Sequence, residues 1–313
     1  MDLNQGIRGG LSLFTEGQQF TQSHSRSFGS HDTVQHSGSI YGAFIGDAAG
    51  AFVEFQLHIN ENEVNEAMKL NGGGTFNTGP GQITDDSEMA VSLFRGLGNS
   101  IIIQNDFIVN GSGLQDLDQI AQNYLDWAHS NPFDIGMTTR TALSPLTQNV
   151  EGIYQQVQKR TLYSQSNGTL MRITPLAVWG SQLNSIDDLY RAVHFEGQMT
   201  HCDKIVIDTA FLYCYAIRLA LNGESDRKVI FETIRDEAKK RQLKLVDEWL
   251  NEAQNDFFPN PCQKGYDHQS ALRKMIIEGG DTDTNAAIVG GLIGACQGAQ
   301  NLNQDQIQKY YET

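Results

Sequence analysis

Residues 42–55 read GAFIGDAAGAFVEF, and this stretch decides how the chain folds. Gly42, Gly46 and Gly50 recur every fourth residue, so on a helix they lie along one face. The same spacing returns near the other end of the chain, at Gly290, Gly294 and Gly298. Each glycine costs a helix up to about 1 kcal/mol relative to alanine, so two such series need a compensating reason. We predict two helices whose glycine faces allow a close backbone approach.

The rest of the chain carries the same helical signal. From residue 38 onward the apolar residues follow a 3.6-residue period, with almost no alternating strand pattern, which predicts an all-α protein. The expected helices span residues 40–55, 62–70, 86–97, 117–129, 171–179, 203–221, 225–241, 245–254, 269–277 and 284–298. The breakers between them are too short to be linkers between domains, so we predict a single domain over residues 37–313.

Residues 1–36 differ from the rest of the chain. They are rich in serine, glutamine, glycine and histidine, lack helical or alternating periodicity, and predict a mobile extension. His24, His31 and His36 lie in this serine-rich context, which argues against a metal site there.

Composition limits the classes of function. The chain has 313 residues with 22 Lys or Arg against 37 Asp or Glu, a net charge of −15, which argues against a nucleic-acid-binding protein. Hydrophobic residues make up 39% of the chain, enough for a sizeable core. The most apolar stretch, residues 205–217, contains Asp208 and is shorter than the roughly 20 residues of a membrane span. We therefore predict a buried core helix there and expect no membrane contact.

The four cysteines, Cys202, Cys214, Cys262 and Cys296, form no paired motif. This spacing favours reduced thiols and a cytoplasmic location over a zinc site or a disulfide framework. The N-terminus also lacks the apolar segment of a secretory signal.

Acidic residues gather at three places. Asp47 and Glu54 are seven residues apart, on nearly the same face of the glycine-rich helix. Residues 84–86 read TDD directly before an amphipathic run, and residues 278–285 read EGGDTDTN before the second glycine-rich helix. Acids at a helix start can be simple caps, because they accept backbone N–H groups and suit the helix dipole.

Capping, however, needs one oxygen at each helix start, whereas these two clusters supply four carboxylates: Asp85, Asp86, Asp281 and Asp283. Like charges packed together are costly unless a cation separates them. Carboxylate and hydroxyl oxygens, without cysteine or clustered histidine, favour Mg²⁺ or Mn²⁺. With Glu54 as a further acid, two ions that activate water are possible.

A third element is the stretch SNGTLMRITP at residues 166–175. Its small residues form a turn at a helix start, where backbone N–H groups can hold an anion such as a phosphate. His201, just before the next helix, could cap it, bind a ligand, act in acid–base chemistry or be purely structural.

Together these blocks resemble the ADP-ribosylglycohydrolases, which include the dinitrogenase reductase-activating glycohydrolases of bacteria. The matching segments, in the family's order, are residues 42–55, 81–87, 167–172, 200–201 and 280–287. The resemblance implies an orthogonal bundle of α-helices with a binuclear Mg²⁺ or Mn²⁺ centre in a cleft.

The resemblance also implies roles for individual residues. The metal ligands would be Thr84, Asp85, Asp86, Asp281, Asp283 and Thr284, with Asp283 as the bridge. Glu54 would lie beside the metals and the scissile ribose, and Asp85 or Asp86 would handle the proton. Contacts to the ribose and diphosphate of ADP-ribose would come from Asn167, Gly168, Thr169, Leu170, Met171 and His201.

The implied activity is removal of ADP-ribose from a modified protein side chain, with arginine favoured over serine as the linked residue. Some relatives are immunity proteins that block an ADP-ribosyltransferase toxin through an N-terminal extension, so residues 1–36 suggest such a role as an alternative. A third possibility is a catalytically inactive relative, against which the full set of acids speaks.

Overall fold

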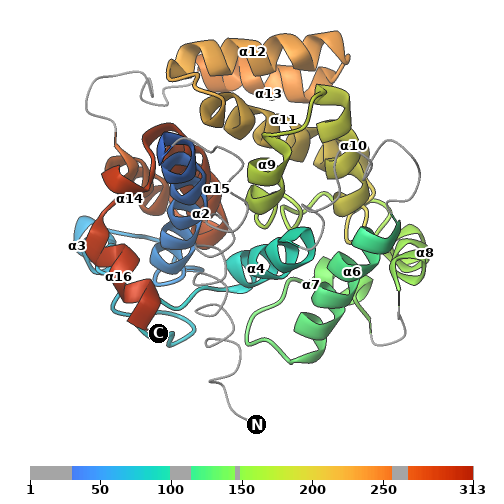
Figure 1. Cartoon of the computed structure of the whole chain (residues 1–313). Helices are drawn as coiled ribbons and strands as arrows, with labels where there is room; N and C mark the ends of the chain where they lie inside the picture. The colour runs from blue at the N-terminus through green and yellow to red at the C-terminus, as the bar shows by residue number, and fades with distance from the viewer. Residues whose placement is uncertain (1–29, 99–113, 145–148, 256–266, 313) are drawn as a thin grey trace. The chain divides into compact units, whose positions relative to one another are not determined.

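The computed structural model describes residues 30–98, 114–144, 149–255 and 267–312, and throughout these ranges the regular secondary structure is helical, without a β-strand (Figure 1). The chain divides into two compact units, one within residues 1–83 and 272–313 and the other within residues 84–271. We call them the first and second units and describe each by itself. The all-α prediction is confirmed for the described residues.

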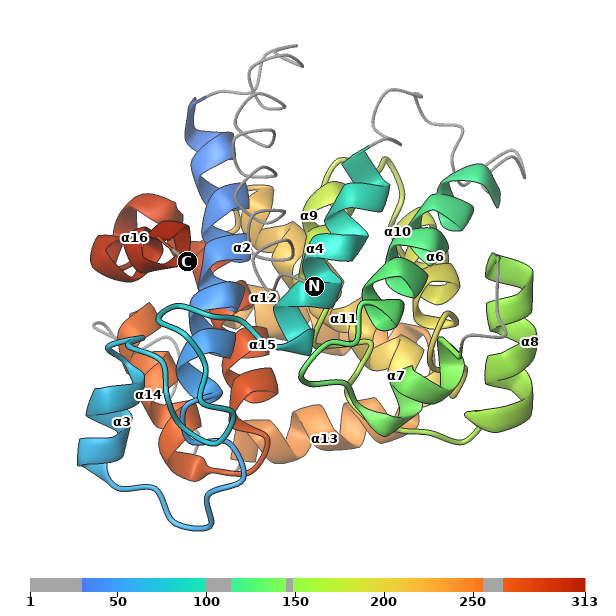
Figure 2. The ribbon, with the colours of Figure 1, turned by 90° about the horizontal axis from the view of Figure 1, so that it is seen from below.

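The first unit contains α2 (Ser30–Gly50), α3 (Glu61–Ala67), most of α14 (His268–Glu278), α15 (Thr282–Gln297), the 3-10 turn η1 (Ala299–Asn301) and α16 (Gln304–Glu312). Helices α2 and α15 lie side by side (Figures 1 and 2). A Cβ atom built on Gly42 would lie 2.2 Å from the carbonyl oxygen of Gly290, and one built on Gly46 would lie 2.1 Å from that of Ala286. The predicted close approach is therefore confirmed, because only glycine leaves room for these carbonyls.

The glycine faces are shifted by one turn from their expected ends. Gly38 extends the face on α2, since a Cβ there would lie 2.5 Å from the Gly294 carbonyl oxygen. Gly298 follows the last residue of α15 as its cap, with a φ of 78°. It still lies against α2, because a Cβ on Gly38 would be 2.7 Å from the Gly298 carbonyl carbon. A positive φ of this kind favours glycine.

The second unit contains α4 (Asp85–Gly98), α6 (Leu114–His129), α7 (Met137–Ala142), α8 (Val150–Arg160), α9 (Thr174–Gly180), α10 (Ile186–Gly197), α11 (Lys204–Leu221), α12 (Arg227–Lys240) and α13 (Lys244–Asn255). Most of α11 is buried, and α9, α10 and α12 pack against it. Helices α4 and α6 pack on each other (Figure 2). The expected core helix at residues 205–217 is thus confirmed, and none of the described helices is long and apolar enough to span a membrane.

All ten expected helices are present with shifted ends, and four further ones, α7, α8, α10 and α16, were not predicted. Helix α2 begins at Ser30, ten residues before its expected start, so residues 30–36 of the predicted extension are helical. Residues 1–29 of that extension, with His24, lie outside the described residues. The single domain over residues 37–313 stays a prediction. Cys202, Cys214 and Cys296 form no disulfide among the described residues. Cys262 lies outside these residues, and the reduced state stays a prediction.

Candidate active site

Asp47 and Asp283 form the acidic centre of the first unit. Asp47 lies in the last turn of α2 and is 0% exposed, and Asp283 lies in the first turn of α15 and is 2% exposed. Their carboxylate oxygens approach within 4.8 Å. The glycine contact causes this proximity, because a Cβ on Gly50 would lie 2.4 Å from the Cα of Asp283. Close helix packing therefore brings two buried acids together.

Glu54 joins Asp283 from the turn that follows α2, so the prediction that it lies on the same helix as Asp47 is wrong: the helix ends at Gly50. Its side chain is buried, and a carboxylate oxygen lies within 4.8 Å of one from Asp283. Thr75 Oγ1 donates a hydrogen bond to the Glu54 carbonyl oxygen at 2.6 Å. The next residue, Phe55, has a φ of 64°, which is rare for a bulky residue and is typical of functional turns. The turn thus holds Glu54 in a fixed place.

The start of α15 separates its two aspartates. Asp283 and Thr284 are buried, and Asp283 Oδ1 accepts the Thr284 backbone N–H at 2.8 Å. Thr282 Oγ1 donates to the Gly50 carbonyl oxygen at 2.8 Å and so ties α15 to the end of α2. Asp281 is the N-cap residue, yet its side chain is exposed and makes no capping hydrogen bond. Of the predicted ligands in the first unit, Asp283 and Thr284 lie inside and Asp281 lies at the surface.

Thr84, Asp85 and Asp86 lie together at the start of α4 in the second unit, and all three are buried. Asp85 Oδ2 accepts a hydrogen bond from the backbone N–H of Gly136 at 3.1 Å. This contact brings the loop before α7, with the half-buried Asp134, beside the predicted ligands. Asp85 is therefore fixed in two ways: its backbone lies in the first turn of α4, and its carboxylate is bound by a loop about fifty residues further along the chain.

The predicted anion turn at residues 166–171 is also in the second unit. The backbone N–H of Met171 donates to the Asn167 carbonyl oxygen at 3.0 Å, which closes the turn. Gly168, Thr169 and Met171 are buried, whereas Asn167 and Leu170 are half-buried. The turn is followed by α9, with Pro175 in its first turn.

His201 packs against this turn and is 0% exposed. Its Nε2 lies 2.7 Å from Ser166 Oγ, and its Nδ1 lies 2.8 Å from Thr200 Oγ1 and 3.2 Å from Thr169 Oγ1. Burial, together with the nearby positive charge of Arg172, lowers the pKa of His201 from about 6.5 to about 3. The imidazole is therefore neutral at physiological pH, with one nitrogen donating and the other accepting.

The sequence signals for some of these residues were present but were not used. Asp47 was singled out as an acid among small apolar residues, yet it was not placed among the predicted ligands. Arg172 lies in a matching segment without a predicted role. Ser166 opens the stretch quoted at residues 166–175, but it received no role of its own. Asp134 carries no local signal, because its loop is brought to Asp85 by the contact of Gly136.

Comparisons with known proteins identify the class. A solved structure described as an ADP-ribosylglycohydrolase-related protein complex shares the fold, with a TM-score of 0.63 and 22% identity, over 88% of this chain and 91% of that one. The ADP-ribosylglycohydrolase family model matches residues 35–313. The chain therefore belongs to the ADP-ribosylglycohydrolase family, a family of enzymes.

Two relatives show the range of the similarity. The ADP-ribosyl-dinitrogen reductase glycohydrolase of Rhodospirillum rubrum is 25% identical over 292 residues, which cover 87% of this chain and 88% of that protein. The ADP-ribosylarginine hydrolase of Serratia proteamaculans is 22% identical over 299 residues, with 87% and 74% covered.

Proposed function

We propose that the protein hydrolyses the bond between ADP-ribose and an arginine side chain of a modified protein, with two divalent cations, Mg²⁺ or Mn²⁺, as cofactors. The observation that carries the proposal is the burial of Asp85, Asp86 and Asp283, three of the four acids that the family resemblance assigns to the metals. Support for arginine comes from the relative that bears the name of an ADP-ribosylarginine hydrolase.

The residues present fit such cations. Asp47, Asp283 and Glu54 are buried carboxylates in one unit, and Asp85 and Asp86 are buried carboxylates in the other. Burying a carboxylate is costly unless a positive partner or several hydrogen bonds compensate it. Oxygen donors of this kind suit hard divalent cations. We therefore propose Thr84, Asp85, Asp86, Asp281, Asp283 and Thr284 as ligands, and add Asp47 to this set.

Residues of the chain would stabilise charge, transfer the proton and bind the substrate. When bound, divalent cations would polarise the ribose hydroxyls and orient a water. Glu54, fixed by its turn, would stabilise the positive charge that develops on the ribose. Asp85 or Asp86 would accept the proton of the attacking water as its oxygen bonds to the ribose carbon, and this proton would pass to the arginine nitrogen that leaves. The Gly136 N–H would hold Asp85 in orientation for this step. The turn at residues 167–171, with the neutral His201, would bind ribose and diphosphate.

The test is release of free ADP-ribose from arginine-linked and serine-linked modified proteins, with Mg²⁺ or Mn²⁺ and then with excess chelator. We expect release from the arginine linkage that chelator abolishes. Release from serine alone would correct the substrate, and release that persists in chelator would refute the metal centre.

A pair of variants makes the test specific to the acids. Asp283→Asn removes a buried carboxylate, and we expect it to abolish both release and Mn²⁺ binding. Asp305→Asn removes an exposed carboxylate of the same unit, in α16, and should behave like the wild-type enzyme. Equal activity of the two variants would contradict the proposal.

A further inference from the structure

Arg172 is a fully buried arginine that immediately follows the turn at residues 166–171. Its side chain is 0% exposed and makes an ion pair with Glu196 of α10, Nε to Oε1 at 2.7 Å. Arg172 Nε also donates to the Tyr124 hydroxyl at 3.1 Å, and that hydroxyl donates to Glu196 Oε1 at 2.6 Å. The guanidinium lies over the Tyr124 ring, 5.1 Å from its centroid. Arg172, Tyr124 and Glu196 come from three separate segments of the second unit.

One terminal nitrogen of the Arg172 guanidinium, Nη1, binds to the turn itself. Arg172 Nη1 donates a 2.6 Å hydrogen bond to the Gly168 carbonyl oxygen. A trans peptide holds its C=O and the next N–H in opposite directions, so this bond also fixes the direction of the Thr169 N–H, away from the buried arginine. Hydrogen bonds to a charged donor are short and strong. Arg172 therefore sets the orientation of a central peptide of the turn.

The end of α10 holds the same turn from a second side. A Cβ on Gly197 would lie 3.3 Å from Thr169 Cγ2, so the absent side chain leaves room for the turn to pack there. The His201 backbone N–H donates to the Gly197 carbonyl oxygen at 2.9 Å, and the imidazole then bonds the hydroxyls of Ser166 and Thr169. The turn is thus clamped between Arg172 and His201.

The ion pair is not arranged for the greatest stability. Arg172 Nη2 and Glu196 Oε2 are buried, and neither has a hydrogen-bond partner among the described residues. Buried ion pairs often stabilise a protein no better than apolar residues of similar size, and unsatisfied buried atoms weaken them further. The pair is therefore better suited to fixing geometry than to adding stability.

We propose that Arg172, supported by Glu196 and Tyr124, is a positioning residue that orients the Gly168–Thr169 peptide for binding the diphosphate and ribose of ADP-ribose. This inference rests on the proposed function, because it assumes that the turn binds ADP-ribose. It extends that function by naming the buried group that organises the binding turn.

The test replaces the ion pair without leaving a buried charge. In the variant Arg172→Met with Glu196→Gln, the glutamine side-chain oxygen can still accept a hydrogen bond from the Tyr124 hydroxyl. We expect calorimetry to show that this variant binds free ADP-ribose at least about 10-fold more weakly than the wild-type enzyme. Its KM should rise by a matching factor, with a smaller change in kcat. We also expect faster hydrogen exchange of the backbone amides at residues 166–171. The single variant Arg172→Lys keeps the charge but cannot bond to Gly168 and Glu196 together. Its affinity for ADP-ribose should therefore lie between those of the wild-type enzyme and the double variant.

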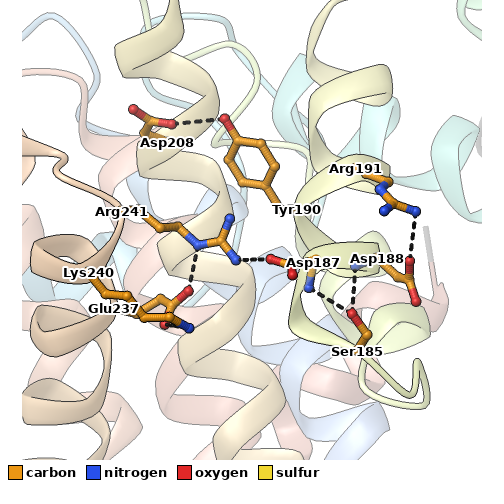
Figure 3. A network of polar contacts seen from close by, with 9 residues as sticks. All are labelled: Ser185, Asp187, Asp188, Tyr190, Arg191, Asp208, Glu237, Lys240 and Arg241. Carbon is orange, nitrogen blue, oxygen red and sulfur yellow. Dashed lines mark hydrogen bonds and ion pairs between the residues drawn. The ribbon is translucent and has the colours of Figure 1, made fainter.

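Arg241 offers a matched control in the same unit. Figure 3 shows its guanidinium between Glu237 and Asp187, with a 2.5 Å bond to Glu237. The side chain also packs over the rings of Tyr190 and Phe211. Arg241→Met therefore removes a networked arginine that makes no contact with the turn. We expect a loss of stability without a change in ADP-ribose affinity or in exchange at residues 166–171.

Each result has a definite reading. Weaker binding together with faster exchange in the double variant supports the positioning role. Unchanged affinity overturns it, whether or not exchange changes, and weaker binding without faster exchange overturns it as well. If the wild-type enzyme binds no ADP-ribose, the proposed function is wrong; the exchange comparison alone then decides whether Arg172 holds the turn.

Discussion

Replacement of Gly46 by alanine tests whether contact between the α2 and α15 backbones builds the acidic centre. The new Cβ would lie 2.1 Å from the Ala286 carbonyl oxygen, and real Cβ atoms essentially never approach within 3.0 Å. The two helices must therefore separate by at least 0.9 Å, the difference between these distances. Overpacking of this kind costs about 1–3 kcal/mol, against a gain of up to about 1 kcal/mol in helix propensity. Because the contact is with backbone rather than with a flexible side chain, we take the upper end of this cost, about 3 kcal/mol, and expect a net destabilisation of about 2 kcal/mol.

The assay is urea denaturation followed by circular dichroism. Tryptophan fluorescence would not report on the first unit, because Trp127, Trp179 and Trp249 all lie in the second. Gly180→Ala is the matched control: its Cβ would meet the flexible end of Leu189 at 2.5 Å and nothing else closer than 3.8 Å. We expect it to cost less than about 1 kcal/mol.

A second readout links this packing to the site. Separation of α2 from α15 moves Asp47 away from Asp283, so Gly46→Ala should also weaken Mn²⁺ binding. If this variant is as stable as the wild-type protein and binds Mn²⁺ equally well, the glycine contact does not set the geometry of the acids.

Three further predictions concern pH, metal and the N-terminus. The folded-state pKa of His201 is lowered to about 3 from about 6.5 in the unfolded chain, so the unfolded state takes up a proton first as pH falls. The free energy of unfolding therefore falls as the pH drops below about 6.5. In urea titrations, the wild-type protein should lose about 2 kcal/mol more of this free energy between pH 7 and pH 5 than the variant His201→Gln. Equal losses would contradict a buried neutral imidazole. Saturating Mn²⁺ should raise the unfolding temperature of the wild-type protein but not that of Asp283→Asn, and an equal rise in both would argue against this ligand. Deletion of residues 1–29 should leave ADP-ribose release unchanged, and it should abolish inhibition of an ADP-ribosyltransferase if the extension acts as an immunity element.

Of the four described helices that the sequence analysis missed, α7 and α8 carry little signal of their own, whereas α10 (Ile186–Gly197) has a serine N-cap and buries Leu189, Ala192 and Val193 at helical spacing. Helix α8 (Val150–Arg160) has a largely polar sequence, with three glutamines, and buries only Val150, Ile153 and Val157. Helix α7 (Met137–Ala142) is only six residues long and has three threonines. Such segments have weak intrinsic helix preference, and packing on neighbours stabilises them. Periodicity within a short window could not have revealed them.

The sequence by itself determined the all-α class, the close approach at Gly42 and Gly46, and the motifs in which the proposed ligands lie, because spacing along one helix and residue chemistry are local properties. Only the tertiary structure decided that Asp47 meets Asp283 and that Arg172 bonds to Gly168, Tyr124 and Glu196. These partners are separated along the chain by as many as 236 residues, the difference between positions 47 and 283. Which of them meet depends on how the helices pack, and no local pattern encodes that choice.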